Sequence, residues 1–395
     1  MRKFPIGFQI RLESSKTMAF LSPIVAVSLT LCFSSIMFLL MDISPIKAFE
    51  VFIISPLSDS YNLGELIVKA TPLMLCAIGL ALCYKANIWN IGAEGQLLFG
   101  ALIGSAVALQ SPAESTSALW LTMSILAGCF AGMFWAAIPT FLYQLFHTNI
   151  ILTSIMLNYI ALYLLLWAVH GPLIDPEGYG FPESALFSDH LLMPLIFENS
   201  RATFSFVAAL ILAVVAAIIL YKTRIGFQLR VFGQDKAAAK YAGFSANKIT
   251  WSVMLVAGAL AGFAGVSEVT GPIGQLIPQI SPGYGYAAII VAYLGRLNPI
   301  GIIVASLFLG TLYMGSDLAQ IELGLPTAIT GLFQGILLFF LLACDYLIDY
   351  RVVWNRSNPK TNNTLQNETT LNKKEEVSKQ ITTQQSHDVS QQGAL

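Results

Sequence analysis

The chain has 395 residues, of which 56% are hydrophobic and only 11% are charged, and its formal net charge is −1. A soluble globular domain carries about 25% charged residues, so this composition excludes an ordinary soluble protein and predicts an integral membrane protein. The cysteines all lie in apolar runs without metal-like or redox-like spacing, so we expect them to be small core residues. They are Cys32, Cys76, Cys83, Cys129 and Cys344.

Ten apolar runs follow one another along the chain, and each is a candidate membrane helix. The first contains 24 uncharged residues, which is too long for the apolar part of a cleavable signal peptide, about 7–15 residues. The eighth is short, so we expect a broken or re-entrant helix there. The runs are Met18–Met41, Leu66–Tyr84, Ile91–Leu109, Ala118–Phe146, Ile150–Val169, Ala202–Tyr221, Ile249–Val269, Tyr284–Leu294, Pro299–Gly315 and Pro326–Ile348.

Charges between these runs indicate their orientation. The N-terminal tail and the segment between Tyr221 and Ile249 are rich in Lys and Arg, whereas residues 171–200 contain five acids and no Lys or Arg. The positive-inside rule places basic loops in the cytoplasm. Ten alternating crossings satisfy these charges and leave both termini cytoplasmic.

The predicted fold is therefore an all-α integral membrane protein with about ten transmembrane helices. Five helices in each half, starting from opposite sides, are typical of an inverted repeat, although the halves share no clear sequence identity. We predict a cytoplasmic tail at 1–17, a transmembrane domain at 18–350 with a long loop at 222–248, and a disordered polar cytoplasmic tail at 351–395. That last tail lacks the apolar residues needed to offset the entropy of ordering.

A polar stretch at residues 85–96 separates the second and third apolar runs. Polar and ionisable groups at membrane depth face a cavity or a protein partner, so they are candidates for a translocation pathway. The alternative is that they hold helices together, and residue type alone leaves the two readings equal. The candidates are Asn87, Asn90, Gly92, Glu94, Gly95 and Gln96.

Polar residues also interrupt later apolar runs. Glu268 and Tyr286 lie near helix-breaking Gly and Pro residues, where they would form a polar gate or, for the tyrosine, an interfacial belt. Asn158 and Tyr159 form a polar pair in the fifth run. An asparagine there either lines the pathway or bonds across helices, worth about 0.6 kcal/mol.

The basic loop contains a short predicted helix that ends at Gly243, a residue that commonly terminates helices. Its small alanine face would suit a groove on another protein. The alternative is an interfacial helix held at anionic headgroups by Arg and Lys. The candidate contact residues are Ala237, Ala238, Ala239, Tyr241 and Gly243.

Several motifs are absent from the sequence. It contains no G-x-x-x-x-G-K-[ST] phosphate loop, no Arg-rich voltage-sensor helix, no His/Cys cluster for a metal and no arguable Ser/His/Asp arrangement. An enzymatic activity on this chain has little support.

Four stretches resemble one family in matching order. Residues 87–96 resemble the N-I-G-x-E-G-Q signature of ABC importer permeases for nucleosides and simple sugars, within the branched-chain amino acid/ribose permease superfamily. Residues 156–161 (MLNYIA), 232–243 and 285–301 resemble that family's further motifs. The likeness covers about 66–348. One departure is Ala237, where the general importer motif begins with Glu.

The resemblance implies a permease subunit in a bacterial inner membrane, with ATP and Mg²⁺ bound by a separate ATPase and no cofactor on this chain. It implies ABC ATPase subunits, a second permease in a heterodimer, an extracytoplasmic solute-binding lipoprotein and membrane lipid as partners, and no nucleic acid. The 237–243 helix would couple the permease to the ATPase. A nucleoside is the preferred solute and a simple sugar the second.

Two other functions fit the composition. An ion-gradient-driven secondary transporter would use Glu94 and Glu268 as proton or sodium sites, and uptake by the chain alone would establish it. A non-transporting scaffold would bind partners through its loop and tail. Deleting residues 357–395 should leave a transporter active and should disable a scaffold that works through its tail.

Overall fold

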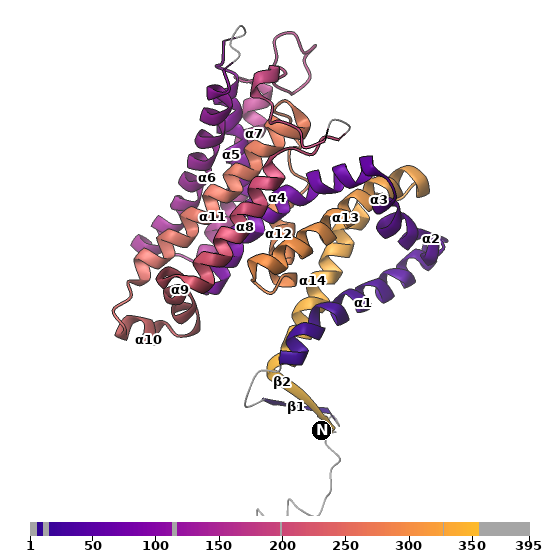
Figure 1. Cartoon of the computed structure of the whole chain (residues 1–395), viewed down its shortest axis with the longest axis vertical. Coiled ribbons are helices and arrows are strands. Elements are labelled where there is room, and N and C mark those ends of the chain that lie inside the picture. Colours follow the sequence, from indigo (N-terminus) through magenta and orange to yellow (C-terminus); the bar gives the residue numbers. More distant parts are fainter. Residues whose placement is uncertain (1–5, 11–15, 113–116, 198–199, 327, 355–395) are drawn as a thin grey trace, which may run out of the picture. The chain divides into compact units, whose positions relative to one another are not determined.

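The computed structural model describes residues 6–10, 16–112, 117–197, 200–326 and 328–354 (Figure 1). The chain divides into two compact units. The larger unit is Pro23–Cys344 and contains every candidate site residue. The smaller unit combines Met1–Ser22 with Asp345–Leu395. Most of the predicted C-terminal tail, residues 355–395, lies outside the described residues.

Among the described residues, ten apolar helices occupy the positions of the ten predicted runs, which confirms a nearly all-helical membrane protein. Seven are long and apolar enough to cross a membrane, and three apolar segments, 93–108, 284–294 and 331–344, are shorter. The inverted repeat stays a prediction. The helices are α1 (Lys16–Leu40), α4 (Ser60–Lys85), α5 (Ala93–Ala108), α6 (Leu119–Phe146), α7 (Ile150–His170), α8 (Ser205–Lys222), α11 (Ala246–Glu268), α12 (Tyr284–Leu294), α13 (Pro299–Leu323) and α14 (Ala328–Asp349).

Shorter elements connect these helices. Between α1 and α4 lie α2 (Pro45–Phe49), the π-helix η1 (Glu50–Ile54) and α3 (Ser55–Ser58). The 3₁₀-helix η2 (Asp189–Leu191) lies in the long acidic loop. The basic loop contains α9 (Arg224–Gln234) and α10 (Lys236–Tyr241), and the π-helix η3 (Val269–Ile273) continues α11.

Two predicted helix ends were wrong, and both errors involve charged residues. Helix α4 begins at Ser60, ahead of the predicted Leu66, and α13 continues to Leu323, beyond the predicted Gly315. Glu65 directly precedes the predicted start of the first, and Asp317 lies two residues beyond the predicted end of the second. In the structure these charges are paired with partners from distant segments, so the helices continue through them.

The smaller unit contains two strands that the all-α prediction did not include. Strand β1 (Ile6–Ile10) pairs antiparallel with β2 (Tyr350–Trp354), with Ile6 opposite Trp354 and Ile10 opposite Tyr350. The strands lie at opposite ends of the sequence, so a reading of local pattern has no signal for their pairing.

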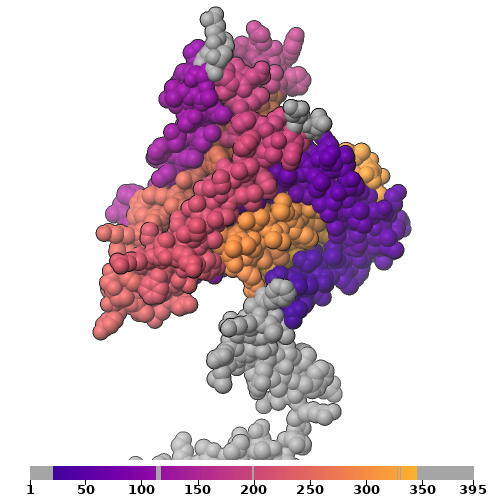
Figure 2. Space-filling model, in the orientation of Figure 1, coloured from indigo at the N-terminus to yellow at the C-terminus, as the bar shows by residue number. Residues whose placement is uncertain are grey.

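Helix α4 lies at the centre of the larger unit. Within its apolar window 89% of the residues are buried, and it packs against α8, α11, α12 and α13. On the face seen in Figure 2, an orange region in the colours of α12 and α13 lies between a crimson and an indigo region. Helix α13 contacts α8, η1 and α3. Most side chains of α4 therefore contact other parts of the protein.

Helices α5, α6 and α11 approach one another through glycines. A Cβ on Gly262 of α11 would collide with the carbonyl oxygen of Gly128 and lie 3.1 Å from the Cα of Gly132, both on α6. A Cβ on Gly100 of α5 would collide with Gly262. Small residues allow such approach, which matters in a membrane because the hydrophobic effect does not drive helices together there.

We expect Gly262→Ala to lower the free energy of unfolding by about 1–3 kcal/mol, because the added methyl group forces packed backbones apart. Thermal unfolding of the purified protein in detergent measures this change. The matched control is Gly335→Ala on α14, where a Cβ meets no atom within 4 Å. Equal effects of the two substitutions would contradict the packing role.

Candidate functional site

The polar stretch after α4 folds into a tight turn. Asn87 takes a left-handed conformation with φ 53°, which asparagine tolerates better than most residues. Asn90 is fully buried, and its Oδ1 accepts a hydrogen bond of 2.9 Å from the backbone N–H of Gly92. Its carbonyl oxygen accepts one of 2.9 Å from the Tyr84 hydroxyl. The turn is therefore held by its own polar groups.

Asn158 of α7 joins this turn to two other helices. Its Oδ1 accepts a hydrogen bond from the N–H of Gly95 at 2.9 Å. Its Nδ2 donates to the carbonyl oxygen of Ile91 at 2.9 Å and to the Tyr286 hydroxyl at 3.0 Å. One buried amide thus satisfies backbone groups at the start of α5 and a side chain of α12.

Glu94 connects α5 directly to α12. Its Oε2 accepts a hydrogen bond of 2.7 Å from the N–H of Gly285, in the first turn of α12. A Cβ on Gly285 would collide with the backbone of Glu94, so only glycine permits this approach. We call this set the amide junction; it comprises Asn90, Gly92, Glu94, Gly95, Gln96, Asn158, Gly285 and Tyr286.

The amide junction brings together eight residues, seven of which the sequence reading selected as candidates. Its polar atoms bond mainly to one another and to backbone, which favours the reading in which they hold helices together. Three candidates lie outside the amide junction. Tyr159 is 53% exposed on the outer face of α7, and Asn87 lies at a separate cavity, where it accepts a hydrogen bond of 3.1 Å from Trp89 Nε1.

Glu268, the remaining pathway candidate, lies in a cluster of charged residues at the end of α11. Arg201 binds Glu65 through two hydrogen bonds, one of 2.8 Å from Nε to Oε1. That hydrogen bond raises the pKa of Arg201, which keeps the guanidinium cationic. Lys69 Nζ lies 3.4 Å from Asp317 Oδ2. We call this cluster the charged chamber.

Two cavities open around the charged chamber. One, of about 500 Å³, is lined by Lys69, Arg201, Glu268 and Tyr284 among others. The other, of about 360 Å³, is lined by Asp317, Tyr313 and Gln334 and also by Lys69. The start of α12 separates the chamber from the amide junction, because Tyr284 lines the chamber while Gly285 binds Glu94.

Four of the five charged residues here were missed by sequence reasoning: Glu65, Lys69, Arg201 and Asp317. A signal was present for Lys69, the sole charged residue in the predicted run Leu66–Tyr84. An ionisable residue within a membrane segment is a candidate functional residue by default. Arg201 and Asp317 lie just outside predicted runs, so nothing local marked them.

The acidic loop between α7 and α8 covers this end of α11. The N–H groups of Ser184, Phe187 and Met193 donate to the carbonyl oxygens of Leu276, Gly274 and Thr270, at 2.8–2.9 Å. The broken backbone after α11 is therefore satisfied by the loop, as irregular backbone in a membrane protein must be. Arg201 lies at the C-terminal end of this loop, where it binds Glu65 of α4.

Helices α9 and α10 form a platform at the other end of α4. Asp235 caps α10 by accepting a hydrogen bond of 2.8 Å from the N–H of Ala237. Ala237 and Ala238 are exposed, and Tyr241 is 97% exposed. Ala239, the third residue of the predicted alanine face, is buried. It therefore packs against the rest of the protein and is not available to a partner.

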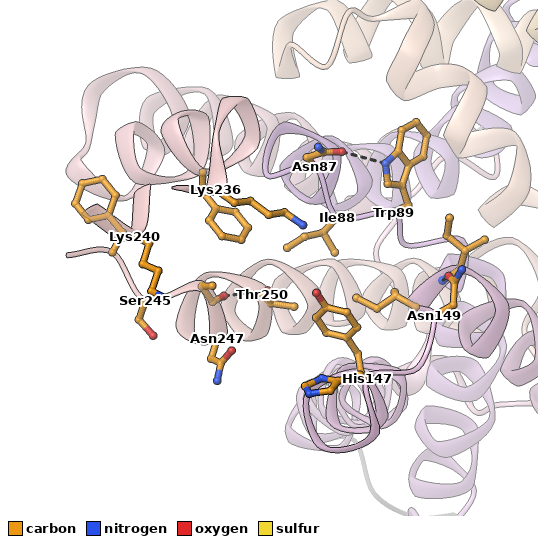
Figure 3. Close-up of a pocket in the computed structure, with 16 residues that line it drawn as sticks. Asn87, Ile88, Trp89, His147, Asn149, Lys236, Lys240, Ser245, Asn247 and Thr250 are labelled. Carbon is orange, nitrogen blue, oxygen red and sulfur yellow. Dashed lines mark hydrogen bonds between the residues drawn. The ribbon is translucent and has the colours of Figure 1, made fainter. Parts of the chain in front are cut away.

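Gly243 ends the platform with φ +80° and a hydrogen bond of 3.0 Å from its N–H to the carbonyl oxygen of Lys240. Beside the platform a cavity of about 710 Å³ lies between α10 and the ends of α6 and α7. Figure 3 shows Lys236 extending towards Ile88, with His147 and Asn149 on another wall.

Among the described residues no group of three or more His, Cys, Asp or Glu side chains is arranged to hold a metal ion. The absence of a cofactor on this chain stays a prediction.

Comparison with known proteins identifies relatives along most of the chain. The family described as "Branched-chain amino acid transport system / permease component" matches residues 62–342. A glucose ABC transporter permease protein, TsgB13 of Haloferax volcanii, is 33% identical over 88% of this chain and 94% of its own length. A guanosine permease, NupP of Bacillus subtilis, is 30% identical over 84% and 94%.

A nucleoside ABC transporter permease protein, NupB of Lactococcus lactis, is 31% identical over 85% of this chain and 94% of its own. Among solved structures, an inward-facing putative metal-chelate type ABC transporter is 18% identical, with a TM-score of 0.42. The match covers 81% of this chain and 99% of that one.

We expect Asn158→Ala to lower the free energy of unfolding by about 2 kcal/mol, because it leaves the Gly95 N–H and the Ile91 carbonyl buried without their partner. Tyr159→Ala, one residue along on the exposed face, should change it by less than about 0.5 kcal/mol. Thermal unfolding in detergent measures both. A smaller loss for Asn158→Ala than for Tyr159→Ala would contradict the holding role of the amide junction.

Proposed function

We propose a specific transport role for this chain, which belongs to the branched-chain amino acid transport system permease family. The chain is the membrane-spanning permease subunit of an ABC importer, and ATP hydrolysis belongs to a separate ATPase chain. Its proposed role is the uptake of a nucleoside or a simple sugar. Support comes from the relatives, whose names specify guanosine, nucleosides and glucose.

The observation that best supports coupling to the ATPase is the exposure of α10. This short helix is capped at both ends and presents Ala237, Ala238 and Tyr241 to solvent. An exposed aromatic side chain on a small-residue surface suits insertion into a groove of a partner, since aromatic anchors dominate many interfaces. Closure of the ATPases would then move α10 and, through α9, the end of α4, which α9 contacts.

The remaining assembly follows from the same proposal. We assign the partners as two ATPase subunits, a second permease that forms a heterodimer with this chain, and an extracytoplasmic solute-binding lipoprotein. The chain would lie in a bacterial inner membrane with α10 and both termini in the cytoplasm. ATP and Mg²⁺ would bind the ATPase, with no cofactor on the permease.

The direct test is transport by the assembled complex in proteoliposomes. We expect ATP-dependent uptake of radiolabelled guanosine or glucose that requires the ATPase and the solute-binding protein. Uptake by the permease alone, driven by a proton or sodium gradient, would overturn the proposal.

We expect Gly243→Pro to abolish ATP-dependent uptake while leaving membrane insertion intact. Proline cannot adopt φ +80° and lacks the N–H that Gly243 donates to Lys240, so the end of α10 must rearrange. Uptake assays and detergent gel filtration measure the two properties.

The control for this substitution is Gly243→Asn, which keeps the N–H and tolerates the left-handed conformation. It should retain at least half of the wild-type uptake. Normal uptake by Gly243→Pro would exclude α10 as the coupling element.

A further inference from the structure

Glu268 is the carboxylate in the charged chamber whose hydrogen-bonding capacity is unused. It is only 7% exposed, yet within the described ranges it forms no hydrogen bond and no ion pair. The other four charges form two pairs, Arg201 with Glu65 and Lys69 with Asp317. A buried polar group without a bonded partner is costly, so this one is a candidate for contact with a ligand.

The side chain of Glu268 lines a cavity inside the protein. Glu268 is the last residue of α11, where the helix passes into the π-helix η3 and then Gly274 at φ +77°. It lines the cavity of about 500 Å³ that also contains Lys69 and Tyr284. Ligand sites in proteins commonly have volumes of about 300–1,000 Å³, so this cavity has the size for a small solute.

The charges around the cavity restrict the ligand. Lys69 and Arg201 both lie within electrostatic range of Glu268. Both cations are already engaged by other carboxylates, so neither is free to bind a phosphate or a carboxylate ligand. A neutral solute with hydrogen-bond donors fits this arrangement, because a carboxylate is rich in acceptor positions.

We propose that Glu268 is the group that recognises solute hydroxyls in this chamber, where its two carboxylate oxygens accept hydrogen bonds from two neighbouring hydroxyls of a neutral solute. This inference rests on the proposed function and deepens it. Ribose in a nucleoside and a free hexose both carry adjacent hydroxyls, so one carboxylate serves either solute class. Glu268 therefore selects for the hydroxyl pair, whatever else the solute carries.

The test is uptake by the full complex in proteoliposomes, with guanosine compared with 2′-deoxyguanosine and glucose compared with 2-deoxyglucose. We expect wild-type kcat/KM to favour the complete hydroxyl pair by about tenfold or more, because a hydrogen bond to a charged group is lost without it. The pair of solutes that is transported identifies the source of the hydroxyls.

Glu268→Gln should reduce this preference to less than about threefold, because an amide offers one acceptor oxygen in place of two. The solute-binding protein is identical in both complexes, so a change in preference reports on the permease. The control is Glu322→Gln, the same substitution at an exposed position of α13, which should keep the wild-type preference. If Glu268→Gln fails to assemble, Glu268→Asp replaces it in the test. This variant keeps the carboxylate on a shorter side chain, and we expect its preference to fall between about threefold and about tenfold.

Two outcomes would overturn the inference, and they differ. A transporting Glu268→Gln complex with unchanged preference would exclude hydroxyl recognition by Glu268 and leave the importer function standing. A wild-type complex that takes up neither guanosine nor glucose would overturn the proposed function and this inference together.

Discussion

Backbone-to-backbone contact between α5, α6 and α11 is the constraint on which the rest of the larger unit, Pro23–Cys344, depends. Gly100, Gly128, Gly132 and Gly262 have no side chain at the points of contact. Lipid provides little drive for helix association, so van der Waals contact at close range has to supply it. This contact holds α5 and α11 side by side. These two helices carry Glu94 and Glu268, the carboxylates of the amide junction and of the charged chamber.

The polar groups inside the unit divide into those that are saturated and those that are not. In the amide junction, the side chains of Asn158 and Glu94 form hydrogen bonds with backbone groups at the starts of α5 and α12. In the charged chamber, on the other side of the start of α12, Glu268 has no bonded partner among the described residues. The short helix α12 separates the two regions, so a shift of this helix would change both at once. Rigid support thus lies directly beside the cavity that we assign to the solute.

Sequence pattern predicted the ten apolar helices well because hydrophobic length is a local property and a membrane demands it. It also located the polar stretch that became the amide junction. It did not predict the pairing of Lys69 with Asp317 or of Glu65 with Arg201, since these contacts join segments far apart in the chain. The same reason hid the pairing of β1 with β2. Local pattern also could not decide whether Glu94 holds helices or lines a pathway, because that depends on Gly285, 191 residues further along the chain.

The pairing of Lys69 with Asp317 has a consequence for biogenesis. Lys69 lies in the most enclosed helix, and its counter-ion is on α13, which the ribosome makes much later. During synthesis α4 must therefore enter the bilayer with an uncompensated ammonium group, at a cost of about 2.5–3.5 kcal/mol on insertion scales if it lies at the helix centre. Lys69 lies about two and a half turns from the start of α4, so its long side chain can reach towards the headgroups until α13 is made. The helices around α4 would then complete their packing only when α13 has been made. A chain that stops before α13 would leave Lys69 without its counter-ion in the bilayer.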